Sequence, residues 1–520
     1  MAFLTDSWKI DVLAFLVGAL TVLYFFIKQK YSYWERKGIK TPSCYNYFVG
    51  HITELFMGKE SFADFSTRMY KSSQEPFIGI YTVLQPILLV RDPELIRTIF
   101  IKDFPHFTDR GVHSNEGYDP LSGNLFSLSG KRWKEMRAKF SPTFTSGKLK
   151  AMFSTFIDCG SILENYLEKL ATNGEILDVS EISASHSTNI IASVAFGIDI
   201  DCIKNPDCEF RVCGRQMFET SFWNNLRFAM FFIAPKLMSL LRIKIASENV
   251  ERFLLSMVKQ NLEYREKNNV SRKDFFQLLI QLRNSGTVQL DGDWDTVIMA
   301  DHKQKTLTLN EMTAQCFVYF GAGFETSSTT LSFCIYELVK NPEIQKRVHE
   351  EIDRVIEQHE GLITYDSLAD MKYLEACIDE TLRKYPPLSF LTRECVKEYK
   401  LPGTDKVIEK GTQLFIPAFA LQRDEKYYEE PDKFIPERFS EENLSGKDLT
   451  NRPYYPFGEG PRNCIGRKMG KLQVKVGLVS MLKKFHFELE DRLKKNEIKF
   501  DPKVFVISPL GGIKLHIKKR

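Results

Sequence analysis

Several features that mark common protein classes are missing from this sequence. Its ten cysteines include no C-x-x-C pair and no regular framework of close spacings, a usage that fits a reducing, cytosol-facing compartment. The 71 basic and 67 acidic residues leave a formal net charge of only +4, far from the basic excess of a dedicated nucleic-acid-binding protein. No repeat of roughly 20–50 residues and no low-complexity block is visible, which argues against a solenoid or a disordered array. We therefore expect a compact body with no nucleic-acid partner.

The apolar residues that are present are patterned mainly for helices. With 43% apolar residues, the 520-residue chain can bury a substantial core, and length alone suggests roughly two to four domains. Helical spacing of apolar residues predicts helices at 274–282, 308–340, 342–358 and 469–485. Short β-branched and apolar runs broken by Pro and Gly predict small sheets at 77–90 and 399–416. The predicted fold class is mainly α with a minor β portion.

One long apolar run stands near the N-terminus, at residues 12–27 (VLAFLVGALTVLYFFI). As a helix it would span roughly 24 Å, close to the thickness of the endoplasmic reticulum membrane. Lys28 and Lys40 follow it, and positive flanks stay on the cytosolic side. We expect residues 1–28 to be a transmembrane signal-anchor and 29–50 a linker, with the body on the cytosolic face of the endoplasmic reticulum membrane. A cleaved signal peptide is the weaker alternative, because no small-residue cleavage site follows the run.

A single cysteine, Cys464, stands in the segment PFGEGPRNCIGRKM directly before a predicted helix. Unpaired backbone N–H groups and the positive dipole at a helix N-terminus favour the thiolate, which is the form that binds a metal ion. Gly460 and Gly466 would let the backbone approach a flat ligand closely. Phe457 could cover the sulfur, and Arg462 could pair with a carboxylate at the edge of the ligand. An isolated cysteine is more often a buried structural residue, so the residues around Cys464 must show whether it binds a ligand.

The surroundings of Cys464 match a known pattern. The residues F-x-x-G-x-R-x-C-x-G, from Phe457 to Gly466, resemble the haem-binding signature of the cytochrome P450 superfamily, and further segments support this resemblance. Glu380-Thr381-Leu382-Arg383 resembles the family's E-x-x-R pair, and PERF at 436–439 resembles its P-E-R-F segment. Together they imply a buried ion-pair cluster with a structural role, formed by Glu380, Arg383 and Arg438.

Two more motifs concern oxygen and the cofactor. Ala322-Gly323-Phe324-Glu325-Thr326 resembles the oxygen-binding A-G-x-[DE]-T motif, which implies that Thr326 and Glu325 are catalytic and deliver protons for cleavage of the O–O bond. Trp133 and Arg137 resemble the propionate-binding W-x-x-x-R pair, and Arg393 occupies the position of another propionate contact. The resemblance therefore implies a haem b (iron protoporphyrin IX) with Cys464 as the thiolate ligand of the metal, contacted by Arg462, Phe457, Trp133, Arg137, Arg393, Ala322 and Gly466.

Within the superfamily, residues 107–150 most resemble insect microsomal enzymes of the detoxifying kind, family six. The similarity extends from Ile39 onward, which implies one large haem-thiolate domain at 51–520 in place of several. It implies a monooxygenase that inserts one oxygen atom of dioxygen into lipophilic substrates, such as plant toxins, insecticides, lipids or steroids. Electrons would come from NADPH through a flavoprotein reductase, with cytochrome b5 as a further candidate donor. By position in the family, apolar pocket walls should come from 104–126, 218–232, 320–326 and 388–391.

Several alternatives stay open at this point. A reductase-independent haem-thiolate isomerase or dehydratase would have no use for Glu325 and Thr326, and a non-catalytic haem sensor would bind haem without consuming NADPH. Basic residues at 131–139 and after Cys464 form either a solvated face or a docking surface for the reductase. The aromatic segment 218–241 is either core or a surface that dips into lipid. A hinge with a single proline leaves the orientation of the body on the membrane open.

Overall fold

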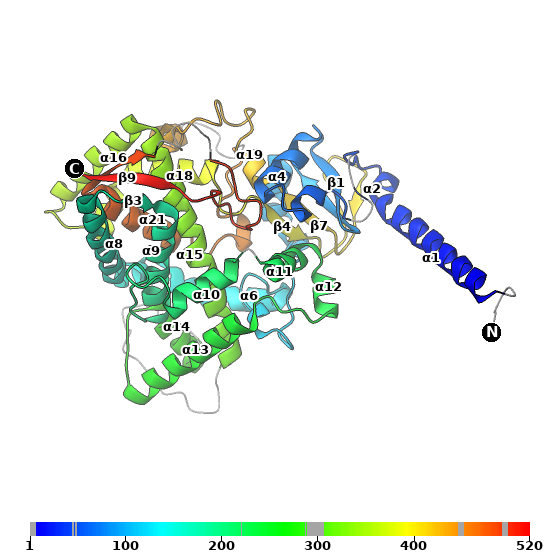
Figure 1. The fold of residues 1–520 in the computed structure, drawn as a ribbon, viewed down its shortest axis with the longest axis horizontal. Coiled ribbons are helices and arrows are strands. Elements are labelled where there is room, and N and C mark those ends of the chain that lie inside the picture. The colour runs from blue at the N-terminus through cyan, green and yellow to red at the C-terminus, as the bar shows by residue number, and fades with distance from the viewer. Residues whose placement is uncertain are drawn as a thin grey trace.

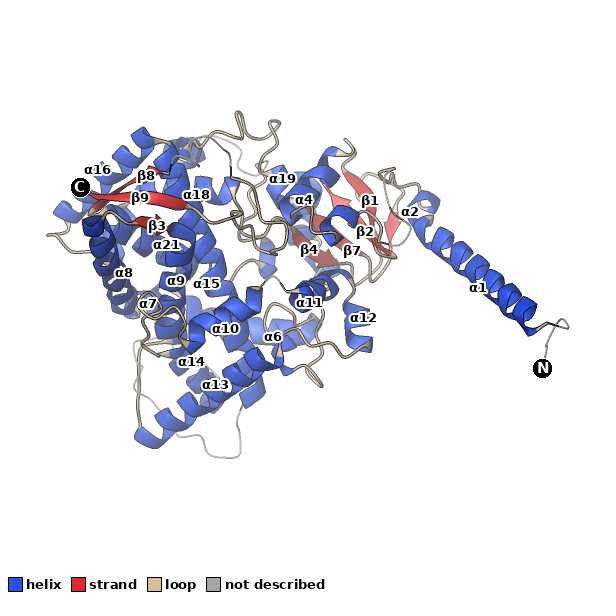
Figure 2. Cartoon of the chain, viewed as in Figure 1, coloured by secondary structure: helices blue, strands red, loops and turns tan. Residues whose placement is uncertain are grey.

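The computed structural model describes residues 7–43, 46, 49–219, 221–286, 288, 306–445, 452–490 and 498–520. Figure 1 shows a broad body from which a single N-terminal helix extends. Helices fill the half of the body that carries the C-terminus, and the largest sheet lies in the half next to the N-terminal helix (Figure 2). With 58% of residues in helices and 9% in strands, the prediction of a mainly α fold with a minor β portion is confirmed.

The helices form most of the body, and most of the longer ones follow from a stretch with an apolar face or a largely buried surface. Their bounds are α1 Trp8–Tyr31, α2 Tyr33–Arg36, α3 Thr53–Phe56, α4 Phe62–Lys71, α5 Pro93–Arg97, α6 Gly130–Phe140, α7 Ser146–Ala151, α8 Phe153–Asn173, α9 Val179–Phe196, α10 Glu209–Phe218 and α11 Phe222–Ile233. The second half of the chain adds α12 Pro235–Leu240, α13 Glu248–Asn268, α14 Phe275–Ser285, α15 Leu309–Lys340, α16 Pro342–Gln358, α17 Tyr365–Asp370, α18 Lys372–Lys384, α19 Ala418–Leu421, α20 Glu441–Ser445 and α21 Arg467–Leu482.

The strands form three small sheets. Their bounds are β1 Phe77–Thr82, β2 Gln85–Val90, β3 Ile176–Asp178, β4 Leu391–Glu394, β5 Tyr399–Lys400, β6 Val407–Ile408, β7 Gln413–Ile416, β8 Phe485–Leu489 and β9 Lys514–Lys519. The largest sheet has the order β1-β2-β7-β4; β2 runs parallel to β7, and the other neighbours are antiparallel. A second sheet has the order β3-β9-β8, and β5 pairs with β6. The predicted sheet regions at 77–90 and 399–416 are confirmed.

The longest helix, α15, runs through the middle of the body (Figure 1) and begins at a capping box between Thr308 and Glu311. It packs against α9, α13 and α21. Two glycines in its centre permit close packing: a Cβ on Gly323 would overlap Ile191 of α9, and one on Gly321 would lie 2.7 Å from Met217 of α10. The tightest contacts of these glycines are therefore with the neighbouring helices.

Most predicted helix boundaries agree with the structure, with one error. The helices expected at 274–282, 308–340 and 342–358 correspond to α14, α15 and α16. The helix expected at 469–485 begins earlier, at Arg467, and ends at Leu482. Phe485 opens β8 instead, because Phe485 and Phe487 alternate into the core as strand residues do.

The N-terminal helix α1 is apolar, with a mean hydropathy of 2.4 over its best window, and none of that window is buried. Its 24 residues are enough to cross a bilayer. The helix continues past Lys28 to Tyr31, which packs with Trp34 against the β1-β2-β7-β4 sheet. The Trp34 indole is fully buried and donates a hydrogen bond to the Ile80 carbonyl at 3.1 Å. The start of the stretch expected to be a linker is therefore fixed to the body.

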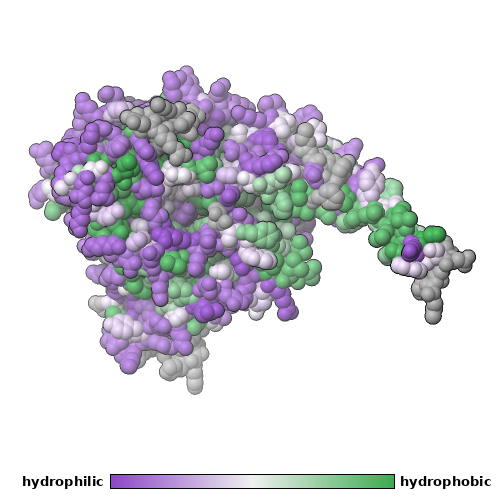
Figure 3. Space-filling model, viewed as in Figure 1, coloured by the Kyte–Doolittle hydropathy of each residue, from purple (hydrophilic) through white to green (hydrophobic). Residues whose placement is uncertain are grey.

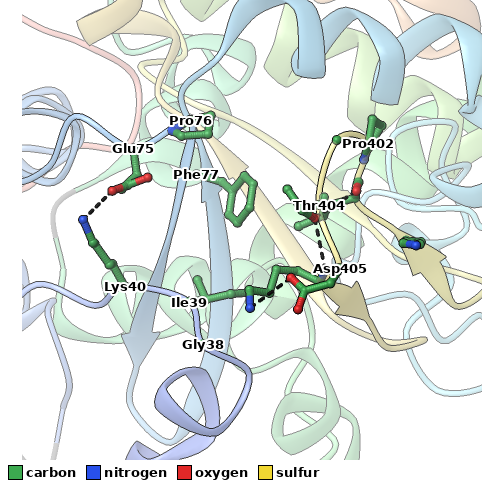
Figure 4. A pocket seen from close by; sticks show the side chains of 13 residues that line it. Gly38, Ile39, Lys40, Glu75, Pro76, Phe77, Pro402, Thr404 and Asp405 are labelled. Carbon is green, nitrogen blue, oxygen red and sulfur yellow. Dashed lines mark hydrogen bonds and ion pairs between the residues drawn. The ribbon is translucent and has the colours of Figure 1, made fainter.

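An open groove of about 820 Å³ lies beside this junction, and Figure 4 shows its walls. It is lined by residues 38–40, 75–77 and 400–406. Lys40 pairs with Glu75 on one side of it, and Lys406 pairs with Asp405 at 3.1 Å. These pairs partly neutralise the groove, and the Gly79 N–H of β1 donates to the Lys40 carbonyl at 2.8 Å, which holds the segment after α1 against β1.

We expect Gly79→Ala to destabilise the junction, because the added Cβ would overlap the ring of Trp34. Overpacking of this kind costs about 1–3 kcal/mol, so the thermal unfolding midpoint should fall. Gly147→Ala in α7 is the matched control, since its Cβ would meet nothing within 4 Å. Equal midpoints for the two variants, measured by intrinsic fluorescence, would contradict this packing.

Candidate active site

A cavity of about 290 Å³ lies between the middle of α15 and the loop that leads into α21. Ala322, Thr326 and Thr330 of α15 line one wall, and Phe457 and Cys464 line another. Cys464 is the only cysteine of the described residues that reaches this cavity. The structure therefore brings the cysteine segment and the A-G-x-[DE]-T segment, which are far apart in the sequence, to one space.

The loop around Cys464 is held by its own backbone. The Cys464 N–H donates to the Phe457 carbonyl at 2.8 Å, and the N–H of Gly466 bonds the sulfur from the N-cap of α21. The sulfur is open to the cavity but enclosed by protein, and this burial raises the pKa of the thiol. The N–H of Gly466 and the cations Arg137 and Arg110 oppose that rise. A positive ion in the cavity would complete the stabilisation of a thiolate.

Gly460 and Gly466, on either side of Cys464, have different neighbours. Gly460 has φ +70°, and a Cβ there would overlap the carbonyl of Phe100. It therefore seats the loop against residues 98–102, which corrects the expectation that Gly460 approaches a flat ligand. Gly466 lines the cavity, and its Cβ would lie 4.0 Å from the Cys464 sulfur. Phe457 lies beside it, with the Arg467 guanidinium 5.7 Å from the ring centre.

Four guanidinium groups line one region of the cavity: Arg110, Arg137, Arg393 and Arg462. The only carboxylate of the described chain within 4 Å of any of them is Asp109, at 3.5 Å from Arg462. Burial and mutual repulsion lower the pKa of Arg462 to about 8, of Arg393 to about 9 and of Arg110 to about 10. So many enclosed cations need an anion, and paired carboxylates suit guanidinium groups best.

Backbone carbonyls orient these arginines. Arg462 donates to the carbonyls of Thr108 at 2.7 Å and Leu128 at 2.6 Å. Arg137 donates to the Asn463 carbonyl and to its amide oxygen, both at 2.8 Å. The Nε of Arg393 is buried without a hydrogen-bond partner among the described residues, and the side chain lines the cavity.

Trp133 does not line the cavity. Its ring lies under the Arg462 guanidinium, 4.2 Å from the ring centre, so it supports Arg462 by a cation–π contact. The sequence expected its indole to point with Arg137 toward the same ligand. Arg110 was not identified from the sequence, although it stands in the FTDRG segment; its position at the cavity depends on contacts with Phe126 and with the Arg462 carbonyl.

Thr326 and Glu325 occupy different surroundings. The Thr326 hydroxyl lines the cavity and donates to the Ala322 carbonyl at 2.7 Å, the common bond of a helical threonine. Glu325 points away from the cavity lining, and burial raises the pKa of its carboxyl to about 7. Arg211 opposes that rise and Glu181 adds to it. Arg211 also pairs with the half-exposed Glu181 at 2.9 Å, so charged groups connect Glu325 to the surface.

The predicted ion-pair cluster is buried in the body. Arg383 donates to both carboxylate oxygens of Glu380, at 2.7 and 2.8 Å, and both side chains are fully buried. Arg438 lies 3.4 Å from Glu380, and the Ile435 N–H donates to the same carboxylate at 3.0 Å. The cluster connects α18 to the segment 436–439 and does not line the cavity.

The remaining walls of the cavity are mostly apolar. Leu125, Phe126, Phe232 and Leu391 come from three of the four expected regions, and Ala322 comes from the fourth. Phe505, which the sequence did not single out, also lines the cavity and stacks on Phe232 with ring centres 4.6 Å apart.

A family model described as Cytochrome P450 matches residues 41–515. This chain belongs to the cytochrome P450 family. The P450 is 40% identical to Probable cytochrome P450 6d5 of Drosophila melanogaster over 509 residues, covering 97% of this chain and 99% of that protein. It is 38% identical to Cytochrome P450 6d3 of Musca domestica, covering 98% and 99%, and 38% identical to Cytochrome P450 6k1 of Blattella germanica, covering 93% of each.

As a cytochrome P450, the protein is a monooxygenase that binds haem through a cysteine thiolate. The residues at the cavity of this P450 fit the group: one sulfur faces the space, and several enclosed cations lack anions. The family also implies redox partners and lipophilic substrates, and the apolar helix α1 is consistent with association with a membrane.

We expect Cys464→Ser to lose the absorption band that a haem–thiolate complex with carbon monoxide gives in the ferrous state, because serine offers no thiolate. Cys316→Ser is the control, since Cys316 is fully buried in α15 and does not line the cavity. A Cys464→Ser protein that kept the wild-type spectrum would exclude this sulfur as the ligand.

Proposed function

We propose that Cys464 is the thiolate ligand of the haem iron and that the enzyme inserts one oxygen atom of dioxygen into lipophilic xenobiotics, including plant toxins and insecticides, or into lipids and steroids. The observation that carries the proposal is the placement of Cys464 and Thr326 on the walls of one largely apolar cavity. Bound haem supplies the activation of dioxygen. The protein contributes binding, exclusion of water and proton transfer.

The proposed haem contacts divide by chemistry. Arg110, Arg137, Arg393 and Arg462 supply donors for the propionates, and Trp133 acts through Arg462. Phe457, Ala322 and Gly466 offer close, uncharged contacts on the cavity walls. Neutralising the propionates would in turn relieve the repulsion among the enclosed guanidiniums.

Two residues of α15 are proposed to carry protons. The Thr326 hydroxyl at the cavity can donate a proton into the cavity when its hydrogen bond to the Ala322 carbonyl breaks. It can then accept a replacement proton from the protein. Burial raises the pKa of Glu325 to about 7, so its carboxyl can hold a proton near neutral pH and pass it inward. Arg211 and Glu181 act on its charge, and Glu181 is half exposed to solvent.

Electrons are proposed to come from NADPH through a flavoprotein reductase that docks beside α6, with cytochrome b5 as a further candidate donor. The side chains of Lys134, Lys139, Arg467 and Lys468 have no acidic partner within 4 Å in the described chain, and α6 contacts the Cys464 loop through Arg137. Lys471 belongs to the same stretch but pairs with Glu375 and Asp379, each at 2.6 Å. The docking surface is therefore smaller than the basic stripe in the sequence.

The body is proposed to lie on the cytosolic face of the endoplasmic reticulum membrane, with α1 as the anchor. Segment 218–241 has two faces: Met230, Phe231 and Met238 are buried, whereas Phe222, Trp223, Leu237, Leu240 and Leu241 are exposed. Hydrophobic surface gathers over α11 and α12 on the side from which α1 extends (Figure 3). This arrangement supports contact of the exposed face with lipid and makes the two interpretations of this segment compatible.

The test is turnover of a panel of lipophilic compounds by purified protein with reductase and NADPH, scored by the mass gain of one oxygen atom. We expect NADPH-dependent products from several members and none without reductase. Products formed without NADPH would indicate an isomerase or dehydratase. Haem binding with no NADPH consumption for any compound would indicate a sensor.

We expect the wild-type rate to fall as pH rises through about 7, because the Glu325 carboxyl loses its proton near that value. In Glu325→Gln the slope over this range should disappear, and more peroxide should be released per NADPH consumed. Glu343→Gln, at an exposed position of α16, is the matched control. An unchanged pH profile in Glu325→Gln would remove Glu325 from the proton path.

A further inference from the structure

Two cysteines face each other in the turn that connects α9 to α10. The sulfurs of Cys202 and Cys208 are 3.0 Å apart, only about 1 Å longer than a disulfide bond. Cys202 is fully buried, and Cys208 is partly exposed at the N-cap of α10. Neither sulfur lines the cavity with Cys464, so the pair is separate from the site described above.

The turn holds both sulfurs in place by its own hydrogen bonds. The Asp201 carboxylate accepts from the N–H groups of Ile203 at 3.1 Å and Lys204 at 3.0 Å. The Cys202 N–H donates to the Asn189 side chain of α9 at 2.8 Å. The N–H of Asn205 donates back to the Asp201 carbonyl at 2.9 Å. Little backbone movement is therefore needed to bring the sulfurs into bonding distance.

We propose that Cys202 and Cys208 form a redox-active dithiol that a peroxide converts to an intramolecular disulfide and that a cellular thiol reductant restores. In a reducing compartment the pair would rest as the dithiol. A metal site is the competing use of paired cysteines, but the described residues contain no group of three or more His, Cys, Asp or Glu side chains arranged for a metal ion.

The oxidation balances with hydrogen peroxide as the oxidant. The accessible Cys208 sulfur attacks one peroxide oxygen, the O–O bond breaks, and hydroxide leaves as water with the Cys208 proton. The resulting sulfenic sulfur is attacked by Cys202, so the S–S bond forms and the S–O bond breaks. The second hydroxide takes the Cys202 proton and leaves as water. Two thiols lose two electrons, and one peroxide gains them.

The surroundings set the order of the steps. Burial and the hydrogen bond to Cys208 raise the pKa of the Cys202 thiol, while Arg211 opposes the rise. Cys202 is therefore the slower partner, and the partly exposed Cys208 is the sulfur that peroxide meets first. Because the second step needs the Cys202 proton to leave, disulfide formation should become faster as pH rises.

The position of the pair connects it to the cavity through α10. This helix packs on α15, where a Cβ on Gly214 would lie 3.1 Å from Phe324, and it carries Arg211, the cation that opposes the raised pKa of Glu325. A disulfide would tie the N-cap of α10 to Cys202, whose N–H is bonded to Asn189 of α9, and would restrict α10 against α15. On the basis of the proposed function, we expect slower turnover in the oxidised form.

The sequence offers a direct chemical readout, because trypsin cuts after Lys204, between the two cysteines. The full-length protein is treated with hydrogen peroxide, alkylated, and digested without reduction. We expect peptide 170–204 linked to peptide 205–211, lighter by two hydrogen atoms than the separate peptides and separated by dithiothreitol. Recovery of both cysteines alkylated, or oxidation of Cys208 to sulfinic acid without a link, would overturn the proposal.

Variants separate this link from chance oxidation. Cys208→Ser should abolish the linked pair, whereas Cys213→Ala, one turn further along α10, should retain it because Cys213 has no thiol partner among the described residues. Retention of a Cys202 cross-link in Cys208→Ser would show that another cysteine is the partner. The wild-type digest needs no variant, so a folding defect in either one does not affect the result.

The activity arm compares product formation before and after peroxide. Oxidised wild type should lose most of its rate and regain it with dithiothreitol, and Cys208→Ser should do neither. An oxidised, linked wild type with an unchanged rate would overturn the coupling to α10. If the reduced enzyme turns over no compound, the proposed function is wrong. The linked peptide still tests whether Cys202 and Cys208 form a disulfide.

Discussion

The structure depends on one electrostatic constraint: a single enclosed space contains a cysteine sulfur and several guanidinium groups that the polypeptide does not neutralise. Asp109 is the only acidic residue of the described chain with a carboxylate within 4 Å of any of these guanidinium groups. Unpaired buried charge is strongly unfavourable, and a bound group that presents a metal ion to the sulfur and carboxylates to the arginines removes the cost at both ends. The protein supplies the guanidinium donors and the sulfur, and the cofactor supplies the opposite charges.

Holding such a site requires a scaffold whose own charges are satisfied. The fully buried Glu380–Arg383 pair shows how: the carboxylate receives two bonds from Arg383 and one from the Ile435 N–H, and further Arg383 donors reach carbonyls of Gln422 and Pro431. A bidentate pair completed by backbone groups can be buried without an orphan donor. Arg393 differs from Arg383 and Arg438 in its position, because it lines the cavity and they do not.

Much of this arrangement could be predicted from local sequence patterns. Helix α15 was predictable because a capping box and a long apolar pattern agree, and Cys464, Thr326 and Arg462 stood in segments with fixed spacing. Arg110 and Phe505 were not predictable, because their place at the cavity comes from packing between distant segments. The same reason explains Trp133: spacing put it near Arg137, but only the tertiary fold stacks it under Arg462. The end of α21 at Leu482 was missed because helical and strand periods overlap over a few residues.

Arg211 shows how one buried cation can couple otherwise separate chemistry. It pairs with Glu181, opposes the raised pKa of Glu325 and opposes the raised pKa of Cys202. Each of those acids, when ionised, competes for the same guanidinium, so the charge on one alters the proton affinity of the others. The raised pKa keeps the Cys202 thiol protonated, so its oxidation to the disulfide leaves the charge around Arg211 unchanged. A thiol pair outside the cavity can therefore reach the proton path only through the position of α10, the helix that carries Arg211.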